Sequence, residues 1–223
     1  MNELTAVVIG ATGLTGTLLL EQLLTDNDFK TIRILVRRKV NISHPKLEQL
    51  VVDFDDINDY ANKFGKGDVI FCCVGTTQKK VKNDKFAYEK VDYDIPVNAA
   101  KIGIQKKFKK FLLVSAIGAK EQSSNFYLSL KGKTENAIAA MPFESVSIFR
   151  PSLLLGKRNE HRFGEKMARG IAEIFSFTFY GWLRKYHPVD AKHVAAAMIQ
   201  QSKSNDRGVH YFDFEGIMNL SEN

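Results

Sequence analysis

The chain has 223 residues, 44% of them hydrophobic and 26% charged, which fits one soluble domain with a substantial core. We find no apolar run of the roughly 20 residues that a membrane span needs, and the first strand begins too early to leave room for a signal peptide. The net charge of +7 suggests nucleic-acid binding, but no nucleic-acid-binding motif accompanies the lysine runs at residues 79–82 and 106–110. We therefore expect neither a membrane nor a nucleic-acid partner.

The cysteine and histidine pattern points to a reducing compartment and to no metal site. Cys72 and Cys73 are adjacent within an apolar run, which is typical of reduced, buried strand residues. His187 and His193 lack metal-ligand spacing with carboxylates or cysteines. The sequence thus predicts a cytoplasmic protein without a metal.

The first feature along the chain is a strand that breaks into glycines and resumes as a helix. Residues 7–9 form the apolar run, Gly10, Gly13 and Gly16 follow, and the helical pattern continues to Leu24. Gly10 allows a tight turn, Gly13 lets the backbone approach a ligand, and Gly16 lets the helix pack close to the sheet. The free N–H groups at the helix start would bind a pyrophosphate, so the stretch predicts a dinucleotide site. The alternative is a glycine-rich turn without a ligand.

The second strand, residues 31–36, ends in Arg37 and Arg38. Sites that prefer NAD carry a carboxylate there for the ribose 2′-hydroxyl, whereas guanidinium groups bind a 2′-phosphate. The pair therefore favours NADP(H) over NAD(H), and the alternative is two exposed arginines in a loop.

The rest of the chain to residue 151 alternates helices with strands that are apolar throughout. We predict strands at 50–54, 68–77, 111–115 and 146–151, and helices at 56–64, 86–102 (with a kink or a new start at Pro96) and 127–140. This order predicts an α/β fold, a Rossmann-type doubly wound parallel sheet with helices on both faces. The small residues around Gly75, at the end of a central strand, would let a cofactor lie across the sheet edge.

The last third loses this rhythm. We predict an aromatic-rich helix at 160–182, a helix at 189–201 and a strand at 208–214. Residues 1–223 would form a single nucleotide-binding domain, with 156–223 as a smaller cap on the substrate side. Its aromatic residues suggest an apolar pocket for an unidentified small molecule, or an exposed surface for a protein partner or a homodimer.

A candidate catalytic group follows the fifth strand. Tyr127 and Lys131 are four residues apart and share one helix face, so the ammonium would lower the pKa of the phenol by stabilising the phenolate. Such a phenol can act as a general acid or base in hydride transfer. Ser115, at the strand end, would hydrogen-bond the substrate oxygen. The alternative is a surface tyrosine beside a lysine.

Together these motifs resemble an atypical short-chain dehydrogenase/reductase. More narrowly, the sequence is similar to the NAD(P)-binding oxidoreductase family of the Tat-interacting protein type (TIP30/CC3-like). The resemblance rests on the following segments: Gly10-Ala11-Thr12-Gly13-Leu14-Thr15-Gly16, Val36-Arg37-Arg38, Val52-Asp53-Phe54, residues 71–77, residues 123–127 with Lys131, and Phe149-Arg150-Pro151.

The resemblance implies a Rossmann fold that binds NADPH, with these roles. The pyrophosphate would lie against Gly10, Thr12, Gly13, Leu14, Thr15 and Gly16. The adenosine end would contact Arg37, Arg38, Asp53, Phe54, Cys73, Val74 and Gly75. The nicotinamide end would contact Arg150, Pro151, Ser152 and Leu153. Tyr127 and Lys131 would be the catalytic pair, with Lys131 also bonding the nicotinamide ribose.

One departure from the family pattern concerns catalysis. Many members carry two small hydroxyl residues at the end of the fifth strand, the second commonly catalytic, and here the pair is Ser115-Ala116. Either Ser115 takes this role, or Ser123 or Ser124 does, or the polarising group is missing. The second hypothesis is therefore a non-catalytic NADPH-binding sensor or partner-binding regulator.

Overall fold

The computed structural model describes residues 3–76, 84–156 and 181–222, with the backbone alone described for 181–183. Its centre is a seven-stranded sheet in the order β3-β2-β1-β4-β5-β6-β9, and every neighbouring pair is parallel. The strands are β1 (Leu4–Ile9), β2 (Phe29–Val36), β3 (Leu47–Val51), β4 (Val69–Cys72), β5 (Lys110–Val114), β6 (Ser145–Phe149) and β9 (Gly208–Phe212). A separate two-stranded ladder joins β7 (Leu154–Leu155) to β8 (Val189–Asp190). The predicted Rossmann-type doubly wound fold is confirmed.

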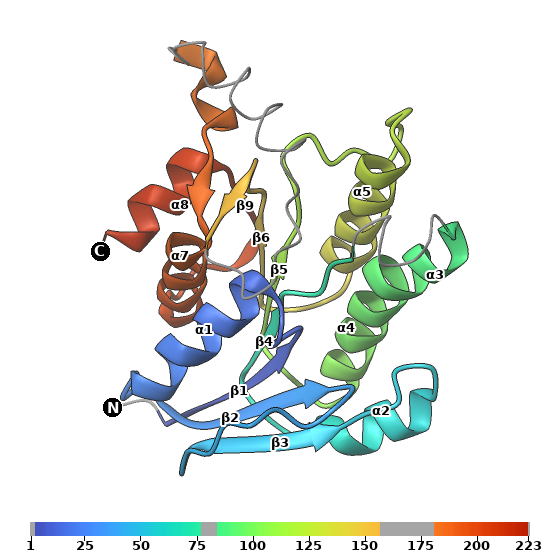
Figure 1. Ribbon diagram of the computed structural model, residues 1–223, viewed down its shortest axis with the longest axis vertical. Helices are drawn as coiled ribbons and strands as arrows, with labels where there is room; N and C mark the ends of the chain where they lie inside the picture. The colour runs from blue at the N-terminus through green and yellow to red at the C-terminus, as the bar shows by residue number, and fades with distance from the viewer. Residues whose placement is uncertain (1–2, 77–83, 157–180, 223) are drawn as a thin grey trace.

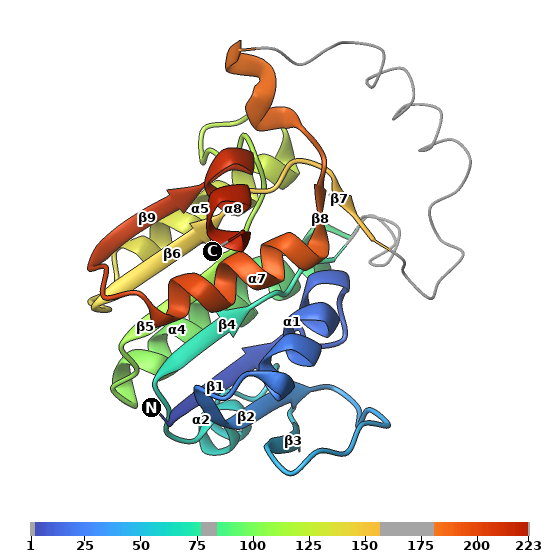
Figure 2. The same ribbon diagram turned by 90° about the vertical axis from the view of Figure 1, so that its left-hand side faces the viewer.

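Helices cover both faces of the sheet, as Figures 1 and 2 show. One layer consists of α1 (Leu14–Thr25), α7 (Ala191–Lys203) and α8 (Phe214–Ser221). The other consists of α2 (Ile57–Phe64), α3 (Lys85–Glu89), the π-helical segment η1 (Lys90–Asp94), α4 (Ile95–Gln105) and α5 (Phe126–Ala139). A 3₁₀ segment, η2 (Gly181–Tyr186), precedes β8.

The strand residues alternate between two cores. On β1, Ala6 and Val8 belong to the core under α1 and α7, whereas Val7 and Ile9 belong to the core under α2 and α4. All four are fully buried. Burying a valine or isoleucine side chain stabilises the fold by about 1.5–3 kcal/mol, so strands with apolar residues on both faces need helices on both faces.

The strand order places a crevice at the carboxyl ends of β1 and β4. From β1 the chain moves outward through β2 to β3, and then crosses back to β4 on the other side of β1. Ile9 and Cys72, the last residues of these two strands, are paired. In open parallel sheets a ligand binds outside the strand ends at such a switch point.

Of the two expectations for Pro96, a kink or a new helix start, the structure shows the second, because Pro96 lies in the first turn of α4. Pro96 has no N–H to donate to the carbonyl of Asp92, four residues earlier. The helix instead passes through η1, where the Ile95 N–H bonds to the Lys90 carbonyl, and the Asp92 carbonyl accepts from the Thr134 hydroxyl at 3.0 Å. The interruption therefore lies one turn before the proline, and it rotates Asp92 into the core.

Two other expectations change in their boundaries. The third strand was expected at 50–54, but β3 spans Leu47–Val51. The Val52 N–H makes the last bond to β2, at the Val36 carbonyl, and the Asp53 N–H bonds to the Asp59 carboxylate instead of to a strand. Asp53 and Phe54 therefore lie in a turn. The expected helix at 160–182 lies almost wholly outside the described residues, whereas α7 and β9 confirm the later helix and strand and α8 was not predicted.

Candidate functional site

The glycine turn is held by close backbone packing. Gly10 has φ +84°, and a Cβ there would lie 2.7 Å from the carbonyl carbon of Cys73. A Cβ on Gly16 would lie 2.1 Å from the Gly10 oxygen, so α1 could not start so close to the strand with a larger residue. A Cβ on Gly13 would lie 3.3 Å from the Gly10 oxygen, which is a tight contact but not an impossible one. Gly10 and Gly16 thus have structural reasons to be glycine, and Gly13 has a weaker one.

The first turn of α1 is open to an anion. Gly13 is its N-cap and supplies no side-chain hydrogen bond, and the turn contains no acidic residue. Unpaired N–H groups and the positive end of the helix dipole favour a phosphate at such a terminus.

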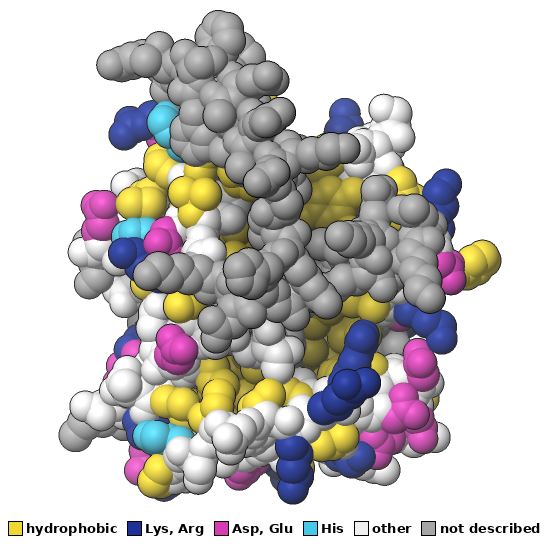
Figure 3. All heavy atoms as spheres, in the orientation of Figure 1, with side chains coloured by type: hydrophobic (Ala, Val, Ile, Leu, Met, Phe, Trp, Pro, Cys, Tyr) yellow, Lys and Arg dark blue, Asp and Glu magenta, His cyan; other side chains and the backbone are white. Residues whose placement is uncertain are grey.

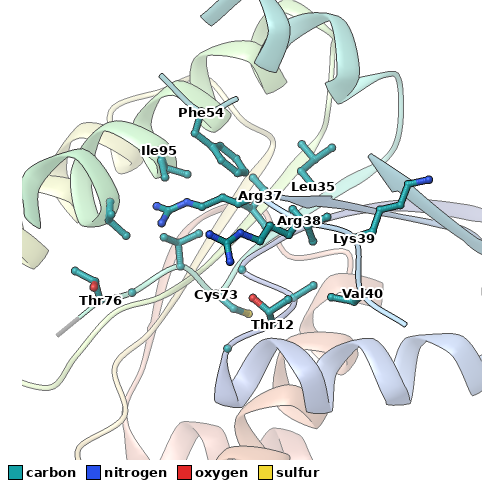
Figure 4. A pocket seen from close by; sticks show the side chains of 18 residues that line it. Thr12, Leu35, Arg37, Arg38, Lys39, Val40, Phe54, Cys73, Thr76 and Ile95 are labelled. Carbon is teal, nitrogen blue, oxygen red and sulfur yellow. The ribbon is translucent and has the colours of Figure 1, made fainter. Parts of the chain in front are cut away.

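A cavity of about 720 Å³ lies in front of this turn, between the ends of β1, β2 and β4 and the start of α4. Its lining includes Gly10, Thr12, Gly13, Arg37, Arg38, Phe54, Cys73, Val74 and Gly75. Nine residues expected at the cofactor therefore line one cavity (Figure 4). The space-filling view shows Lys and Arg side chains beside a hollow floored by apolar side chains (Figure 3).

The two arginines lie side by side at this cavity. In Figure 4, Arg37 and Arg38 extend in the same direction, whereas Lys39 points away from them. Both arginines are exposed and neither forms an ion pair within the described parts of the chain. Both also line a neighbouring hollow of about 940 Å³, which contains Asp53 and shares Phe54. Two adjacent guanidinium groups that form no ion pair with a described residue suit a phosphate.

The turn after β3 positions Phe54 and Asp53. The Asp53 N–H bonds to the Asp59 carboxylate at 2.8 Å, and the Asp53 carboxylate accepts from the Asp55 N–H at 3.0 Å. Phe54 meets the buried ring of Tyr60 edge to face, with ring centroids 4.8 Å apart. An apolar ring fixed in this way offers a flat contact to a nucleotide base.

Tyr127 and Lys131 lie on the first turns of α5, which begins after the N-cap Asn125. The Lys131 ammonium nitrogen is 6.0 Å from the centre of the Tyr127 ring. Lys131 is buried and forms an ion pair of 2.9 Å with Asp92, which is fully buried in η1. A Cβ on Gly75 would lie 4.0 Å from the Lys131 nitrogen. The lysine therefore lies at the Gly75 end of the cavity.

Sequence reasoning missed Asp92. Asp92 is one of several charged residues before Pro96, together with Glu89, Lys90 and Asp94, so the sequence gives no signal that singles it out. Its burial depends on the register change in η1 and on Thr134, 42 positions away, and spacing alone does not reveal either.

The groups around Tyr127 have opposing effects on the pKa of its phenol. Burial raises the pKa of the Tyr127 phenol above its ordinary value, Lys131 acts to lower it, and Asp92 acts to raise it. For Lys131, burial acts to lower the pKa, but Asp92 and Tyr127 together hold it above the ordinary value of 10.5. The lysine effect expected from the sequence is present, but in the protein alone burial outweighs it.

Ser115 follows β5 and is 6% exposed. Its hydroxyl oxygen is buried and has no hydrogen-bond partner among the described residues. Ser123 instead accepts a hydrogen bond from the Asn125 N–H in the loop before α5, and Ser124 is exposed. Of the three serines, Ser115 is the one with an unused hydroxyl in the protein interior.

Residues 150–153, the segment expected at the nicotinamide, are held by contacts with α5, β9 and His187. Arg150 donates from Nε to the buried Glu135 at 3.0 Å, and its guanidinium lies 4.3 Å from the centre of the Tyr211 ring. The Ser152 hydroxyl donates to the carbonyl of His187. Several expected site residues do not line the described cavity: Leu14, Thr15, Gly16, Ser115, Tyr127, Lys131, Arg150, Pro151, Ser152 and Leu153.

The described residues contain neither a membrane-spanning helix nor a cluster of metal ligands. No helix there is long and apolar enough to cross a bilayer. No group of three or more His, Cys, Asp or Glu side chains is placed to hold a metal ion there.

Residues 10–160 match a protein family described as NAD(P)H-binding. Protein HTATIP2 of Rattus norvegicus is 37% identical over 172 residues, which make up 76% of this chain and 70% of the relative. Two fungal proteins with the name "Protein FMP52, mitochondrial" are also similar. That of Meyerozyma guilliermondii is 33% identical over 78% of each chain. That of Eremothecium gossypii is 31% identical over 91% of this chain and 90% of its own.

Solved structures agree with the fold. The UDP-N-acetylglucosamine 4-epimerase of Methanobrevibacter ruminantium M1 superposes with a TM-score of 0.72, over 96% of this chain and 77% of the epimerase, at 17% identity. MoeE5, solved with UDP-glucose and NAD, superposes with a TM-score of 0.71 over 98% of this chain and 81% of its own, at 14% identity. At such identities the likeness is one of fold alone.

Proposed function

Because the chain belongs to the NAD(P)H-binding family and is a relative of HTATIP2 and FMP52, we propose that it is an NADP(H)-dependent oxidoreductase of the short-chain type. It would reduce a carbonyl, or oxidise a hydroxyl, of a small molecule. One observation carries the proposal. The glycine turn and two arginines without an ion pair among the described residues line one cavity at the carboxyl edge of the sheet, and Gly75 of the same cavity lies near the Lys131 ammonium.

The residues present fit the cofactor. The open turn of α1 would hold the pyrophosphate, and Arg37 and Arg38 would hold the 2′-phosphate with charge-assisted hydrogen bonds. Phe54 would pack against the adenine. Gly75, where a Cβ would lie 4.0 Å from the Lys131 nitrogen, leaves room beside the ammonium.

The chemistry follows from the three polar side chains beyond Gly75. NADPH, when bound, supplies the hydride. The Tyr127 hydroxyl would give its proton to the substrate oxygen, and the Lys131 ammonium would stabilise the phenolate that remains. The Ser115 hydroxyl, which has no partner among the described residues, would donate to the same substrate oxygen.

The test is equilibrium binding of NADPH and NADH to the wild type, Arg37→Ala and Arg38→Ala. A hydrogen bond to a charged group contributes about 1.5–3 kcal/mol, so each variant should lose about 10- to 100-fold in NADPH affinity. NADH affinity should change little because NADH lacks the 2′-phosphate. Lys39→Ala removes one positive charge from the same turn but points away, and it should change NADPH binding far less.

Equal losses for NADPH and NADH in the arginine variants would refute the proposed 2′-phosphate site. Failure of the wild type to bind either nucleotide would remove the enzyme proposal altogether.

The alternative is a sensor in which NADPH occupancy changes the binding of a protein partner. The observation that favours it is Ala116, which stands where many family members carry the catalytic hydroxyl. Tyr127→Phe separates the two. An enzyme should lose about 10²- to 10⁴-fold in turnover of a carbonyl substrate, whereas a sensor should keep NADPH-dependent partner binding unchanged.

The remaining assignments are expectations. The substrate would approach from the side of residues 156–223, of which residues 157–180 lie outside the described structure. The compartment would be the cytoplasm, as two adjacent free cysteines favour, and the fungal relatives named mitochondrial provide the competing hypothesis. Cell fractionation would decide between them. Partners are a small-molecule substrate and, in the sensor case, a protein or a second copy of this chain.

A further inference from the structure

Asp92 is a carboxylate with no exposed surface in the middle of an apolar layer. Removing a charge from water costs several kcal/mol, so a buried carboxylate persists where partners compensate for that cost. Asp92 has two such partners. One carboxylate oxygen forms an ion pair with the Lys131 ammonium at 2.9 Å, without the geometry of a hydrogen bond, and the other accepts the Thr76 N–H at 2.9 Å.

The backbone around Asp92 is built to place it there. Pro96 deprives the Asp92 carbonyl of its usual helical partner, and the π-helical register of η1 follows. The Thr134 hydroxyl, fully buried on α5, donates to the freed carbonyl at 3.0 Å. Thr134 is three residues after Lys131. Helix α5 therefore contacts both the backbone carbonyl and the side chain of Asp92.

Asp92 therefore connects two parts of the proposed site. Thr76 belongs to the segment after β4, which includes Gly75 at the end of the cavity. Lys131 belongs to the helix that carries Tyr127. A single carboxylate thus joins the nucleotide side of the crevice to the side that carries the proposed acid.

We propose that Asp92 is a positioning residue that keeps the Lys131 ammonium charged and fixed beside Tyr127. The catalytic consequence of this role rests on the function proposed above, but the charge state of Lys131 can be tested without assuming that function. The titratable groups that face Lys131 are Asp92 from η1, Tyr127 from α5 and Cys72 from β4. Tyr88 of α3 faces Tyr127 with ring centroids 6.4 Å apart.

Among these groups, only Asp92 brings a negative charge at neutral pH. Glu135, one turn further along α5, is engaged by Arg150. Burial disfavours the ammonium, so without Asp92 the lysine would lose its proton at a lower pH.

The experiment is a pH titration of the Lys131 side chain by NMR in protein labelled with ¹⁵N-lysine, without any ligand. Lys131→Arg identifies the signal. Asp92→Asn keeps an oxygen that can accept from Thr76 and replaces the charged oxygen that faces Lys131 with a neutral NH2 group. Glu135→Gln makes the same change in the other ion pair and is the matched control. We expect the Lys131 pKa to fall by about 1–3 units in Asp92→Asn and to stay within about half a unit in Glu135→Gln.

Three results would overturn the inference. They are an unchanged Lys131 pKa in Asp92→Asn, an equal fall in Glu135→Gln, and a wild-type Lys131 that titrates below an exposed lysine. The last needs no variant, so the inference stays testable even if Asp92→Asn does not fold. If the wild type binds no nucleotide but Lys131 titrates as expected, the proposed function fails and the role of Asp92 stands. If the wild type binds NADPH but the Lys131 pKa does not depend on Asp92, the role of Asp92 fails and the proposed function stands.

Discussion

At the scale of single residues, the site is marked by polar groups that the fold buries at a cost. The Asp92 carboxylate is compensated by the Lys131 ammonium and by one hydrogen bond from the Thr76 N–H, whereas the Ser115 hydroxyl has no partner of either kind among the described residues. An unpaired buried hydroxyl costs about 1–3 kcal/mol of stability. A residue that weakens the fold in this way has a simple explanation if a substrate oxygen completes its hydrogen bond.

We therefore predict opposite effects of Ser115→Ala on stability and on activity. The free energy of unfolding in urea should stay the same or rise by up to about 1 kcal/mol, because an unpaired hydroxyl is removed. Turnover of a carbonyl substrate should fall by about 10²- to 10³-fold, the usual cost of losing a donor to the reacting oxygen.

Ser123→Ala and Ser124→Ala are the controls, because either serine is the alternative donor. Loss of turnover in one of these, with Ser115→Ala fully active, would move the role to the loop. A large loss of stability in Ser115→Ala would contradict its assignment as an unpaired group.

At the scale of elements, the glycine turn joins β1 to α1 and sets the floor of the cavity. Its three glycines are not equivalent, since only Gly10 and Gly16 face backbone that a Cβ would overlap by a wide margin. Gly13 faces the Gly10 oxygen at 3.3 Å and lines the cavity. Packing explains two of the glycines, and a ligand gives the best reason for the third.

Alanine substitution should separate these reasons. Gly16→Ala should lower the free energy of unfolding by at least about 2 kcal/mol, since α1 must move away from the Gly10 carbonyl. Gly13→Ala should cost less stability yet weaken NADPH binding by at least about tenfold, because Gly13 lines the cavity in which the pyrophosphate would lie. Urea unfolding and equilibrium binding measure the two effects. A Gly13→Ala protein that binds NADPH normally would mean that this glycine serves the turn alone.

The sequence predicted the features that depend on local patterns and missed those that depend on contacts between distant residues. The glycine turn, the arginines after β2 and the Tyr127–Lys131 spacing are local patterns, and the structure places the turn and the arginines at one cavity. Asp92 depends on Thr134, and the end of β3 depends on pairing with β2. Such contacts join residues distant in sequence, so periodicity does not reveal them.

At the scale of the whole molecule, the parallel sheet separates the basic segments. Arg37 and Arg38 follow the carboxyl end of β2, whereas residues 106–109 precede the amino end of β5, on the opposite edge of the sheet. The arginines also face Asp53, Asp55 and Asp56 around the second hollow. Among the described residues these segments do not form one continuous basic face, which is why we expect the arginines to serve a small anion.

The same arrangement predicts how ligands stabilise the molecule. The cavity is lined by segments after β1, β2 and β4, so a ligand that fills it holds together elements far apart in sequence. A ligand at 100 times its dissociation constant adds about 2.7 kcal/mol, which for a domain of this size corresponds to a rise in Tm of about 5–10 °C. Adenosine 2′,5′-bisphosphate, which carries the 2′-phosphate but no nicotinamide, should produce this rise at matched saturation in the wild type and in Tyr127→Phe. At the same concentration, Arg37→Ala should show a much smaller rise, because the fragment binds mainly through the phosphate that the arginines hold. A scanning calorimeter measures all three, and an equal rise in Arg37→Ala would place the 2′-phosphate away from this arginine.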